Sequence, residues 1–305
     1  MKYVNYYSKK AFLFIFEVVV ILGLMFNNIA PVFAQAAPNP AQPNHALAAF
    51  TDCNSVSGIP ALECAALVAL YNSTGGPSWT HHIDWLQTDT PCSWYGVVCS
   101  GVHVIGITFH NIDAGSNSNN LSGSLPHELG NLTYLIDLTF NGNHLSGSIP
   151  PELGNLTKLN VIWLNDNQLS GSIPPQLGNL TDLTDLELFD NQLSGSLPPE
   201  LGNLTKLQNL ALYLNQLSGS IPPQLGNLTN LKNLQIELNQ LRGSIPVSLK
   251  NLTKLTYFYF ASLNSLCEPA DTGFQTWLNQ VYSHDTAALC SGSFKLYLPL
   301  VSKGG

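Results

Sequence analysis

Closely spaced carboxylates are the residues of this sequence best suited to acid–base chemistry. Asp185 and Glu187 stand two residues apart, and Asp166 and Asp190 stand 24 residues apart at matching places of a repeated segment. Two carboxyl groups act as an acid and a base when burial or a neighbouring charge drives their pKa values apart. We expect these groups to face open solvent with no desolvating wall, so the sequence does not predict an enzyme.

The other reactive side chains predict neither a metal site nor a cofactor. His81 and His82 form a pair in an expected loop, and no phosphate-binding glycine loop or metal-ligand spacing occurs in the sequence. The net charge is −8 and the sequence has no basic cluster. We therefore expect no nucleic acid among the partners.

The six cysteines predict disulfides and an exported protein. Their number is even, four precede the repetitive part of the chain, and two follow it. A zinc site is the alternative, but the sequence has no C-x₂-C pair and no histidine at ligand spacing. Proximity in the sequence alone suggests the pairs Cys53–Cys64 and Cys92–Cys99, and a bond between Cys267 and Cys290 would hold a C-terminal helix in place.

A repeat of 24 residues must position these side chains. Each unit carries the spacing L-x-x-L-x-L-x-x-N-x-L, in which alternate residues of a short strand point inward. A fixed period of this length indicates a solenoid. The landmark Leu-Ser/Arg-Gly-Ser begins at Leu121, Leu145, Leu169, Leu193, Leu217 and Leu241.

Two motifs give the repeat a family resemblance over about residues 52–266. The unit Leu-Ser-Gly-Ser-Ile-Pro-Pro-x-Leu-Gly-Asn-Leu-Thr and the segment Cys-Ser-Trp-Tyr-Gly-Val-Val-Cys at 92–99 resemble the plant-type leucine-rich repeat proteins. The resemblance implies an α/β solenoid, a right-handed superhelix of about seven 24-residue repeats with a concave parallel β-sheet and disulfide-stapled N- and C-terminal caps.

Members of this family include receptor-kinase ectodomains, polygalacturonase-inhibiting proteins and some ice-binding proteins, and the resemblance implies recognition rather than catalysis. No membrane span or kinase follows the array in this sequence. We therefore expect a kinase-less member that is secreted or associated with the cell surface.

Composition predicts the organisation of the chain. Three lysines, an apolar run and Val32-Phe33-Ala34 predict a signal peptide over residues 1–34, with an uncleaved membrane anchor as the alternative. No other segment is expected to span a membrane. The segments that follow are a Pro-rich disordered spacer (35–49), an N-terminal cap (50–101), the repeats (102–263), a C-terminal cap (264–292) and an apolar tail (293–305).

Apolar clusters predict how the two ends are closed. A helix is expected from Ala61 to Tyr71, and Trp79, Trp85 and Trp94 are expected to plug the end of the core, with a sugar-stacking platform as the alternative. At the other end, helical spacing predicts a helix that covers the last coil through Phe274, Trp277, Leu278 and Val281.

The consensus positions predict the path of each coil. Asn167 and its equivalents should bond to the backbone of their own and the next coil, and Gly171 and its equivalents should permit a tight bend. Pro174-Pro175 and its equivalents are expected to hold the outer segment extended. Seven extra residues, 112–118, predict a polar loop.

The outward positions of the strands do not repeat, unlike the rest of the unit. Exposed aromatic residues inside a field of one sign mark recognition surfaces. We predict that this face binds a basic or mixed polypeptide, and the alternatives are a polysaccharide, ice and a merely solvated sheet. The predicted ligand-binding residues are Trp163, Asp166, Asp185, Glu187, Phe189, Asp190, Tyr213, Glu237 and Tyr259.

Overall fold

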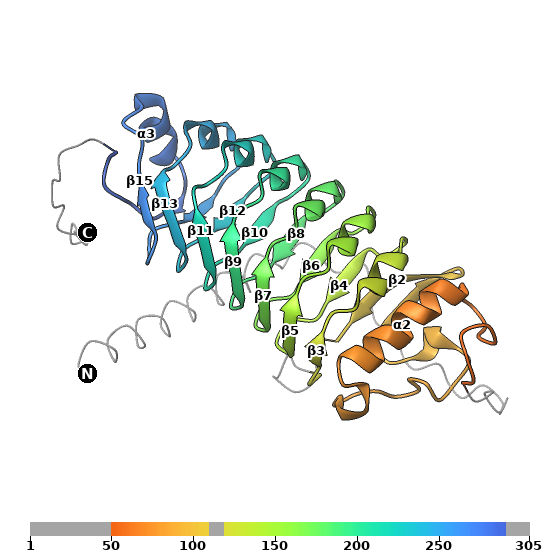
Figure 1. The fold of residues 1–305 in the computed structure, drawn as a ribbon. Coiled ribbons are helices and arrows are strands. Elements are labelled where there is room, and N and C mark those ends of the chain that lie inside the picture. Colours follow the sequence, from red (N-terminus) through yellow and green to blue (C-terminus); the bar gives the residue numbers. More distant parts are fainter. Residues whose placement is uncertain (1–49, 110–118, 291–305) are drawn as a thin grey trace, which may run out of the picture. The chain divides into compact units, whose positions relative to one another are not determined.

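Short parallel strands stack coil on coil, from the helix α2 at one end to the helix α3 at the other (Figure 1). The computed structural model describes residues 50–109 and 119–290. The predicted signal peptide, spacer, polar loop and apolar tail lie outside the described residues. The strands form two sheets, of nine and of seven strands.

The nine-stranded sheet takes one strand from each coil and carries the predicted site. β1 pairs with β2 antiparallel, while β2 and all later neighbours run parallel. Its members are β1 (Val97–Ser100), β2 (His103–Thr108), β4 (Asp137–Thr139), β6 (Val161–Trp163), β8 (Asp185–Glu187), β10 (Asn209–Ala211), β12 (Asn233–Gln235), β14 (Tyr257–Tyr259) and β16 (Ser283–His284).

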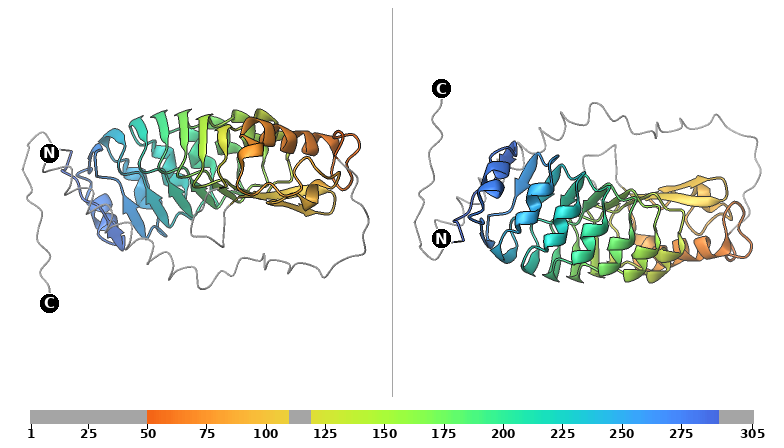
Figure 2. Two further views of the ribbon diagram at one scale, coloured as in Figure 1. Left: turned by 90° about the horizontal axis from the view of Figure 1, so that it is seen from below. Right: turned by 90° about the horizontal axis from the view of Figure 1, so that it is seen from above.

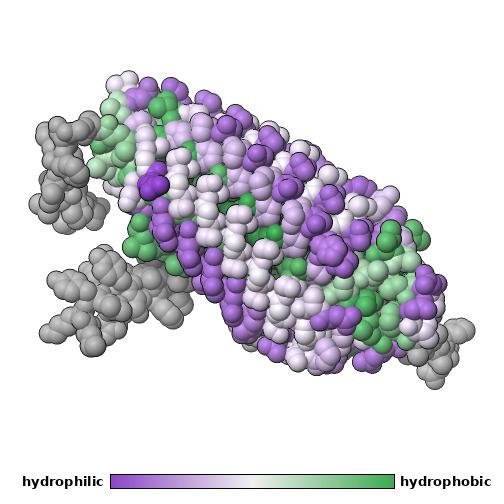
Figure 3. All heavy atoms as spheres, in the orientation of Figure 1, coloured by the Kyte–Doolittle hydropathy of each residue, from purple (hydrophilic) through white to green (hydrophobic). Residues whose placement is uncertain are grey.

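The seven-stranded sheet was not predicted, because its Gln-Leu-Ser-Gly-Ser segments lack strand-favouring residues. Hydrogen bonds from the neighbouring coil impose the extended form. Figure 3 shows this side covered largely by hydrophilic and neutral residues. The strands are β3 (Ser122–Ser124), β5 (His144–Ser148), β7 (Gln168–Ser172), β9 (Gln192–Ser196), β11 (Gln216–Gly219), β13 (Gln240–Ser244) and β15 (Ser265–Cys267).

The outer segments are 3₁₀ turns, so the prediction of an extended outer segment was wrong. Pro174 is extended, with φ −64° and ψ 128°, but Pro175 begins a turn, since a proline at the first helical position lacks only a donor that would be unpaired there. The right panel of Figure 2 shows the turns in a row. They are η4 (His127–Asn131), η5 (Pro151–Asn155), η6 (Pro175–Asn179), η7 (Pro199–Asn203), η8 (Pro223–Asn227) and η9 (Val247–Asn251).

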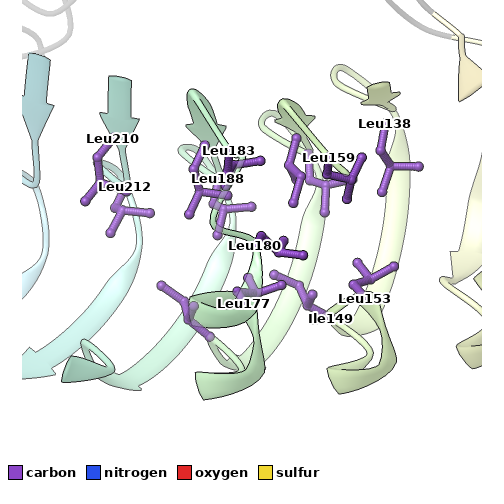
Figure 4. Close-up of a cluster of buried hydrophobic side chains, with 14 of the residues drawn as sticks. Leu138, Ile149, Leu153, Leu159, Leu177, Leu180, Leu183, Leu188, Leu210 and Leu212 are labelled. Carbon is purple, nitrogen blue, oxygen red and sulfur yellow. The ribbon is translucent and has the colours of Figure 1, made fainter. Parts of the chain in front are cut away.

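Leucine and isoleucine side chains from all three sides fill the interior of each coil. Leu159 and Leu183 point inward from the sheet side, and Leu153 and Leu177 meet them from the 3₁₀ turns (Figure 4). All four side chains are buried. The apolar positions of the repeat therefore specify one continuous core.

The repeated asparagines form the predicted ladder, but their side-chain amides bond to the backbone of their own and the preceding coil, and not to that of the next one. Asn167 Oδ1 accepts from the backbone N–H of Leu145 at 2.9 Å, and Nδ2 donates to the carbonyls of Phe140 and Leu164 at 3.0 and 3.2 Å. Asn264 extends the ladder by accepting from the N–H of Leu241 at 2.8 Å. It follows Asn239 by 25 residues, so the last coil holds one extra residue, which the 24-residue alignment missed.

The N-terminal end is closed by α2 (Ala61–Ser73), the 3₁₀ turns η2 (Gly76–Ser78) and η3 (Pro91–Ser93), and a cluster of aromatic rings. Trp79, Trp85 and Trp94 are almost fully buried. They plug the core as predicted and are not a sugar-stacking platform.

The C-terminal end is closed by α3 (Thr272–Leu278), whose Phe274, Trp277 and Leu278 are buried. Asp271 caps this helix by accepting from the N–H of Phe274 at 2.7 Å. The disulfides of the two ends are Cys53–Cys64, Cys92–Cys99 and Cys267–Cys290, the pairs expected from the sequence.

Candidate functional site

Most of the predicted site residues meet on neighbouring coils of the nine-stranded sheet. Trp163 on β6 lies in register with Glu187 on β8. Beyond the strands the stacking continues, because the N–H of Asp166 donates to Phe189 at 3.0 Å and that of Asp190 donates to Tyr213 at 3.1 Å. The 24-residue period therefore carries side chains from distant parts of the sequence to one face.

The rings of Phe189 and Tyr213 form the centre of this face. Their centroids lie 4.4 Å apart and their planes differ by 7°, a stacked pair. Burial raises the pKa of the Tyr213 hydroxyl, and four carboxylates raise it further. These carboxylates belong to Asp166, Glu237, Glu187 and Asp190.

Glu187 and Glu237 are half-buried and partly desolvated, so the prediction that Glu187 faces open solvent was wrong. Burial raises the pKa of Glu187 to about 7, and the charges of Asp185 and Asp166 add to the shift. Burial also raises the pKa of Glu237 to about 8; a backbone hydrogen bond opposes the shift and Asp285 adds to it. Coils of a parallel sheet stack only ~4.8 Å apart, so bulky neighbours exclude water from these groups.

Asp166 and Asp190, which also lie near Tyr213, are both exposed. Partial burial raises the pKa of Asp166; a hydrogen bond from Asn165 Nδ2 lowers it, and the nearby Asp190 raises it. That hydrogen bond measures 2.6 Å. Both aspartates have left-handed backbone, with φ of 54° at Asp166 and 50° at Asp190.

Asp185 and Tyr259 differ from the other predicted residues. Asp185 accepts hydrogen bonds from the hydroxyl of Thr184 and from Asn209 Nδ2, so it belongs to a polar ladder along the sheet. Tyr259 belongs to the C-terminal end of the sheet, where its hydroxyl lies 2.8 Å from that of Ser283. The predicted ligand-binding residues therefore do not form a single cluster.

We define the acidic/aromatic cluster as Trp163, Asp166, Glu187, Phe189, Asp190, Tyr213 and Glu237. Within residues 50–109 and 119–290, the ion pairs are His103–Glu63, His127–Glu128, Lys206–Asp182 and Lys250–Asp271, all outside the cluster. No cationic side chain of the described part of the chain therefore forms an ion pair with the cluster.

The cluster also holds buried polar atoms without a hydrogen-bond partner, namely Trp163 Nε1 and Glu237 Oε2. Two more such atoms, Asn141 Oδ1 and Asn165 Oδ1, lie beside it on the same face, although neither asparagine is among the predicted ligand-binding residues. Asn141 lies two residues after Thr139, and Asn165 lies two residues after Trp163, so their position relative to the strands could have identified them. Buried polar atoms without partners are rare in proteins, so this face has unused bonding capacity.

The described residues offer neither a metal site nor a membrane span. No group of three or more metal-ligating side chains occurs among them. No helix in the part of the chain that the structure describes is long and apolar enough to cross a membrane.

Two family models match the chain. A leucine-rich repeat N-terminal domain matches residues 61–100, and a leucine-rich repeat region matches residues 116–263. Together with the stacked parallel sheets and the capped ends, these matches show that the chain is a plant-type leucine-rich repeat protein. No curated protein matches the sequence.

Solved structures of plant receptors share this fold. The ectodomain of the receptor kinase GASSHO1/SCHENGEN3 from Arabidopsis thaliana, in complex with CASPARIAN STRIP INTEGRITY FACTOR 2, is 31% identical with a TM-score of 0.61, and the match covers 75% of this chain and 29% of that one. The Arabidopsis HAESA ectodomain with an IDA peptide hormone ligand is 31% identical with a TM-score of 0.61, covering 76% and 37%. The PEPR1–AtPEP1 complex is 30% identical with a TM-score of 0.64, covering 74% and 31%. The chain thus spans about a third of the length of these structures.

Proposed function

We propose that this protein is an extracellular recognition module that binds a basic polypeptide segment through its acidic/aromatic cluster. A peptide hormone is bound in the similar HAESA structure, which supports a peptide as the ligand class. Three disulfides support an oxidising, extracellular location.

The observation that carries the proposal is a cluster of acidic groups that form no ion pair with a cationic side chain of the described residues. Four carboxylates surround the stacked rings of Phe189 and Tyr213, and the pKa values of Glu187 and Glu237 are raised to about 7 and about 8. A lysine or arginine of a ligand would favour the ionised form of these groups and would also find aromatic faces for cation–π contact. An acidic ligand would be repelled by the same field.

Calorimetric titration of the full chain with lysine/arginine peptides, acidic peptides of equal length and neutral oligosaccharides tests the proposal. We expect binding of the basic peptides alone, weakened roughly tenfold or more in the double variant Glu187→Gln/Glu237→Gln, because each substitution removes a charge from the contact. The control is Glu200→Gln, which changes an exposed carboxylate of η7, and it should bind like the wild type.

Equal affinity of the wild type and the double variant for the basic peptides would contradict the proposal. Binding of the oligosaccharides alone would favour the polysaccharide alternative instead.

A further inference from the structure

The residues that immediately precede the ladder asparagines form a single column along the coils, which we call the rim column. Its backbone is left-handed throughout, with φ from 50° at Asp190 to 67° at Gly142. From Asp166 to Leu238 the column is continuous, since the carbonyls of Asp166, Asp190, Leu214 and Leu238 each accept from a ladder asparagine N–H of the preceding coil. Its members are Gly142, Asp166, Asp190, Leu214, Leu238 and Leu263.

Leucine is a poor residue for this backbone. Glycine adopts left-handed φ freely and aspartate tolerates it, whereas a larger side chain meets its own carbonyl oxygen there. Nevertheless leucine occupies three successive coils, with φ of 54° at Leu214, 54° at Leu238 and 65° at Leu263. The backbone conformation therefore does not account for the choice of leucine.

Core packing does not account for it either. Leu214 is 38% exposed and Leu263 is 80% exposed, and Leu238 is only half-buried. These side chains carry both backbone strain and exposed apolar surface. Strained residues concentrate at functional sites, and contiguous exposed apolar surface marks interaction sites.

The leucines continue the acidic/aromatic cluster. Leu214 follows Tyr213 directly and Leu238 follows Glu237 directly. Within the rim column itself, the side chains change from acidic at Asp190 to apolar at Leu214 between neighbouring coils. One ligand that lies across the coils therefore meets negative charge first and aliphatic surface next.

We propose that Leu214, Leu238 and Leu263 are the apolar half of the binding surface, and that its occupant is an amphipathic peptide. Its basic residues lie on the acidic/aromatic cluster and its aliphatic residues lie on the three leucines. This inference rests on the proposed function, because the charge of the cluster identifies the basic half of the peptide.

The coil spacing sets the pattern of the peptide. Neighbouring coils of a parallel sheet lie ~4.8 Å apart, so Asp190 and Leu238, two coils apart, are separated by roughly 10 Å. A peptide in the polyproline II form rises ~3.1 Å per residue with three residues per turn, so residues three positions apart face the same side and span about that distance. The ligand therefore carries a basic and an aliphatic residue about three positions apart.

Two sets of synthetic peptides test the inference by calorimetric titration of the full chain. One set carries lysine or arginine and leucine at this spacing, in both chain directions, and the other has serine in place of leucine. For the wild type, we expect the better leucine peptide to bind roughly tenfold or more tightly than its serine counterpart. The variant Leu214→Asn/Leu238→Asn should lose this advantage and bind the serine peptides unchanged.

The same variant should have a higher denaturation midpoint than the wild type, because asparagine adopts left-handed φ more readily than leucine. Weaker binding by a more stable protein would separate a binding role from a structural one. The matched control is Leu62→Asn in α2, which removes a 67%-exposed leucine far along the chain from the rim column and should keep the advantage of the leucine peptide.

The inference would be overturned if Leu214→Asn/Leu238→Asn still bound the leucine peptide more tightly than the serine peptide. It would also be overturned if the wild type bound the two peptides equally. The proposed function would survive either result as long as the serine peptides still bind. Failure of both peptide sets to bind the wild type would instead reject the proposed function. A wild-type dimer that becomes monomeric in the variant, with peptide binding unaltered, would assign the leucines to a second copy of the chain and overturn the inference.

Discussion

Glu187 lies in register with Trp163, and Glu237 occupies the position next to Tyr213 on the following coil. Both residues are half-buried, and burial raises the pKa of both carboxyl groups, with Asp185 and Asp166 adding to the shift at Glu187 and Asp285 adding to it at Glu237. Asp185 differs from these two glutamates, because its carboxylate accepts hydrogen bonds from Thr184 and Asn209. The identity of a neighbour on the next coil thus decides whether an acid of this sheet is solvated, bonded or desolvated.

The raised pKa of Glu187 predicts an unusual dependence of stability on pH. Folding raises this pKa to about 7, so the folded chain holds the proton more tightly than the unfolded chain. The free energy of unfolding should therefore fall as pH rises from about 4.5 to about 7, by at most about 3 kcal/mol from this residue. Glu187→Gln should flatten this part of the curve, as urea denaturation at a series of pH values would reveal.

Glu200→Gln serves as the control, because it removes an exposed carboxylate of η7. If the wild type and Glu187→Gln showed the same dependence of the free energy of unfolding on pH, the conclusion that burial raises the pKa of Glu187 would be wrong.

The face on which each site residue lies follows from the sequence, whereas its environment does not. Alternation within the strand and the 24-residue period placed Trp163 beside Glu187. Burial depends on which side chains lie on adjacent coils and how they pack, so the partial burial of Glu187 was not predicted, whereas Asp166 and Asp190 are exposed as expected. Leu263 also escaped the alignment, because an inserted residue in the last coil moves the ladder to Asn264.

At the scale of elements, close contact between the 3₁₀ turns requires glycine. A Cβ atom at Gly178 would lie 2.4 Å from the backbone oxygen of Glu200 on the next coil, and Gly154 is similarly placed against Gln176. The equivalent residue of the last 3₁₀ turn is Lys250, where α3 and not another coil follows. Its ammonium lies 3.7 Å from the carboxylate of Asp271. The change from glycine to lysine thus marks the end of the stack.

We expect Gly178→Ala to separate two coils and to lower the free energy of unfolding by about 1–3 kcal/mol, since the methyl group meets backbone that has no room to move. Denaturant unfolding followed by circular dichroism would measure the loss. Asn179→Ala, at an exposed position of the same turn, should change stability by less than about 0.5 kcal/mol. A stability of Gly178→Ala equal to that of the control would show that the coils tolerate a wider spacing.

The sequence predicted those elements whose residues carry their own signal. Hydrophobic spacing identified α2 and α3, and the positions of the cysteines identified the disulfides. The strands of the seven-stranded sheet carry no such signal, because their pairing depends on the neighbouring coil. The 3₁₀ turns were missed for a different reason, since proline was assigned to extended backbone although it also fits the first position of a helix.

At the scale of the whole molecule, one repeat serves two purposes. Its apolar, asparagine and glycine positions build a core and a ladder that are nearly the same in every coil. Its outward strand positions are free to differ, and there the acidic/aromatic cluster and the rim leucines lie. The fold could therefore be predicted from the period, whereas the ligand must be inferred from the few positions that do not repeat.

Proton release on ligand binding tests the central claim most directly. At pH 7 the carboxyl group of Glu187 is about half protonated and that of Glu237 is mostly protonated. A bound cationic peptide should ionise both, so titration of the wild type in buffers of different ionisation enthalpy should show release of between about one and two protons per peptide. Glu187→Gln/Glu237→Gln should release almost none. Binding of a basic peptide to the wild type without proton release, or with proton uptake, would contradict the assignment of the acidic/aromatic cluster as the binding site.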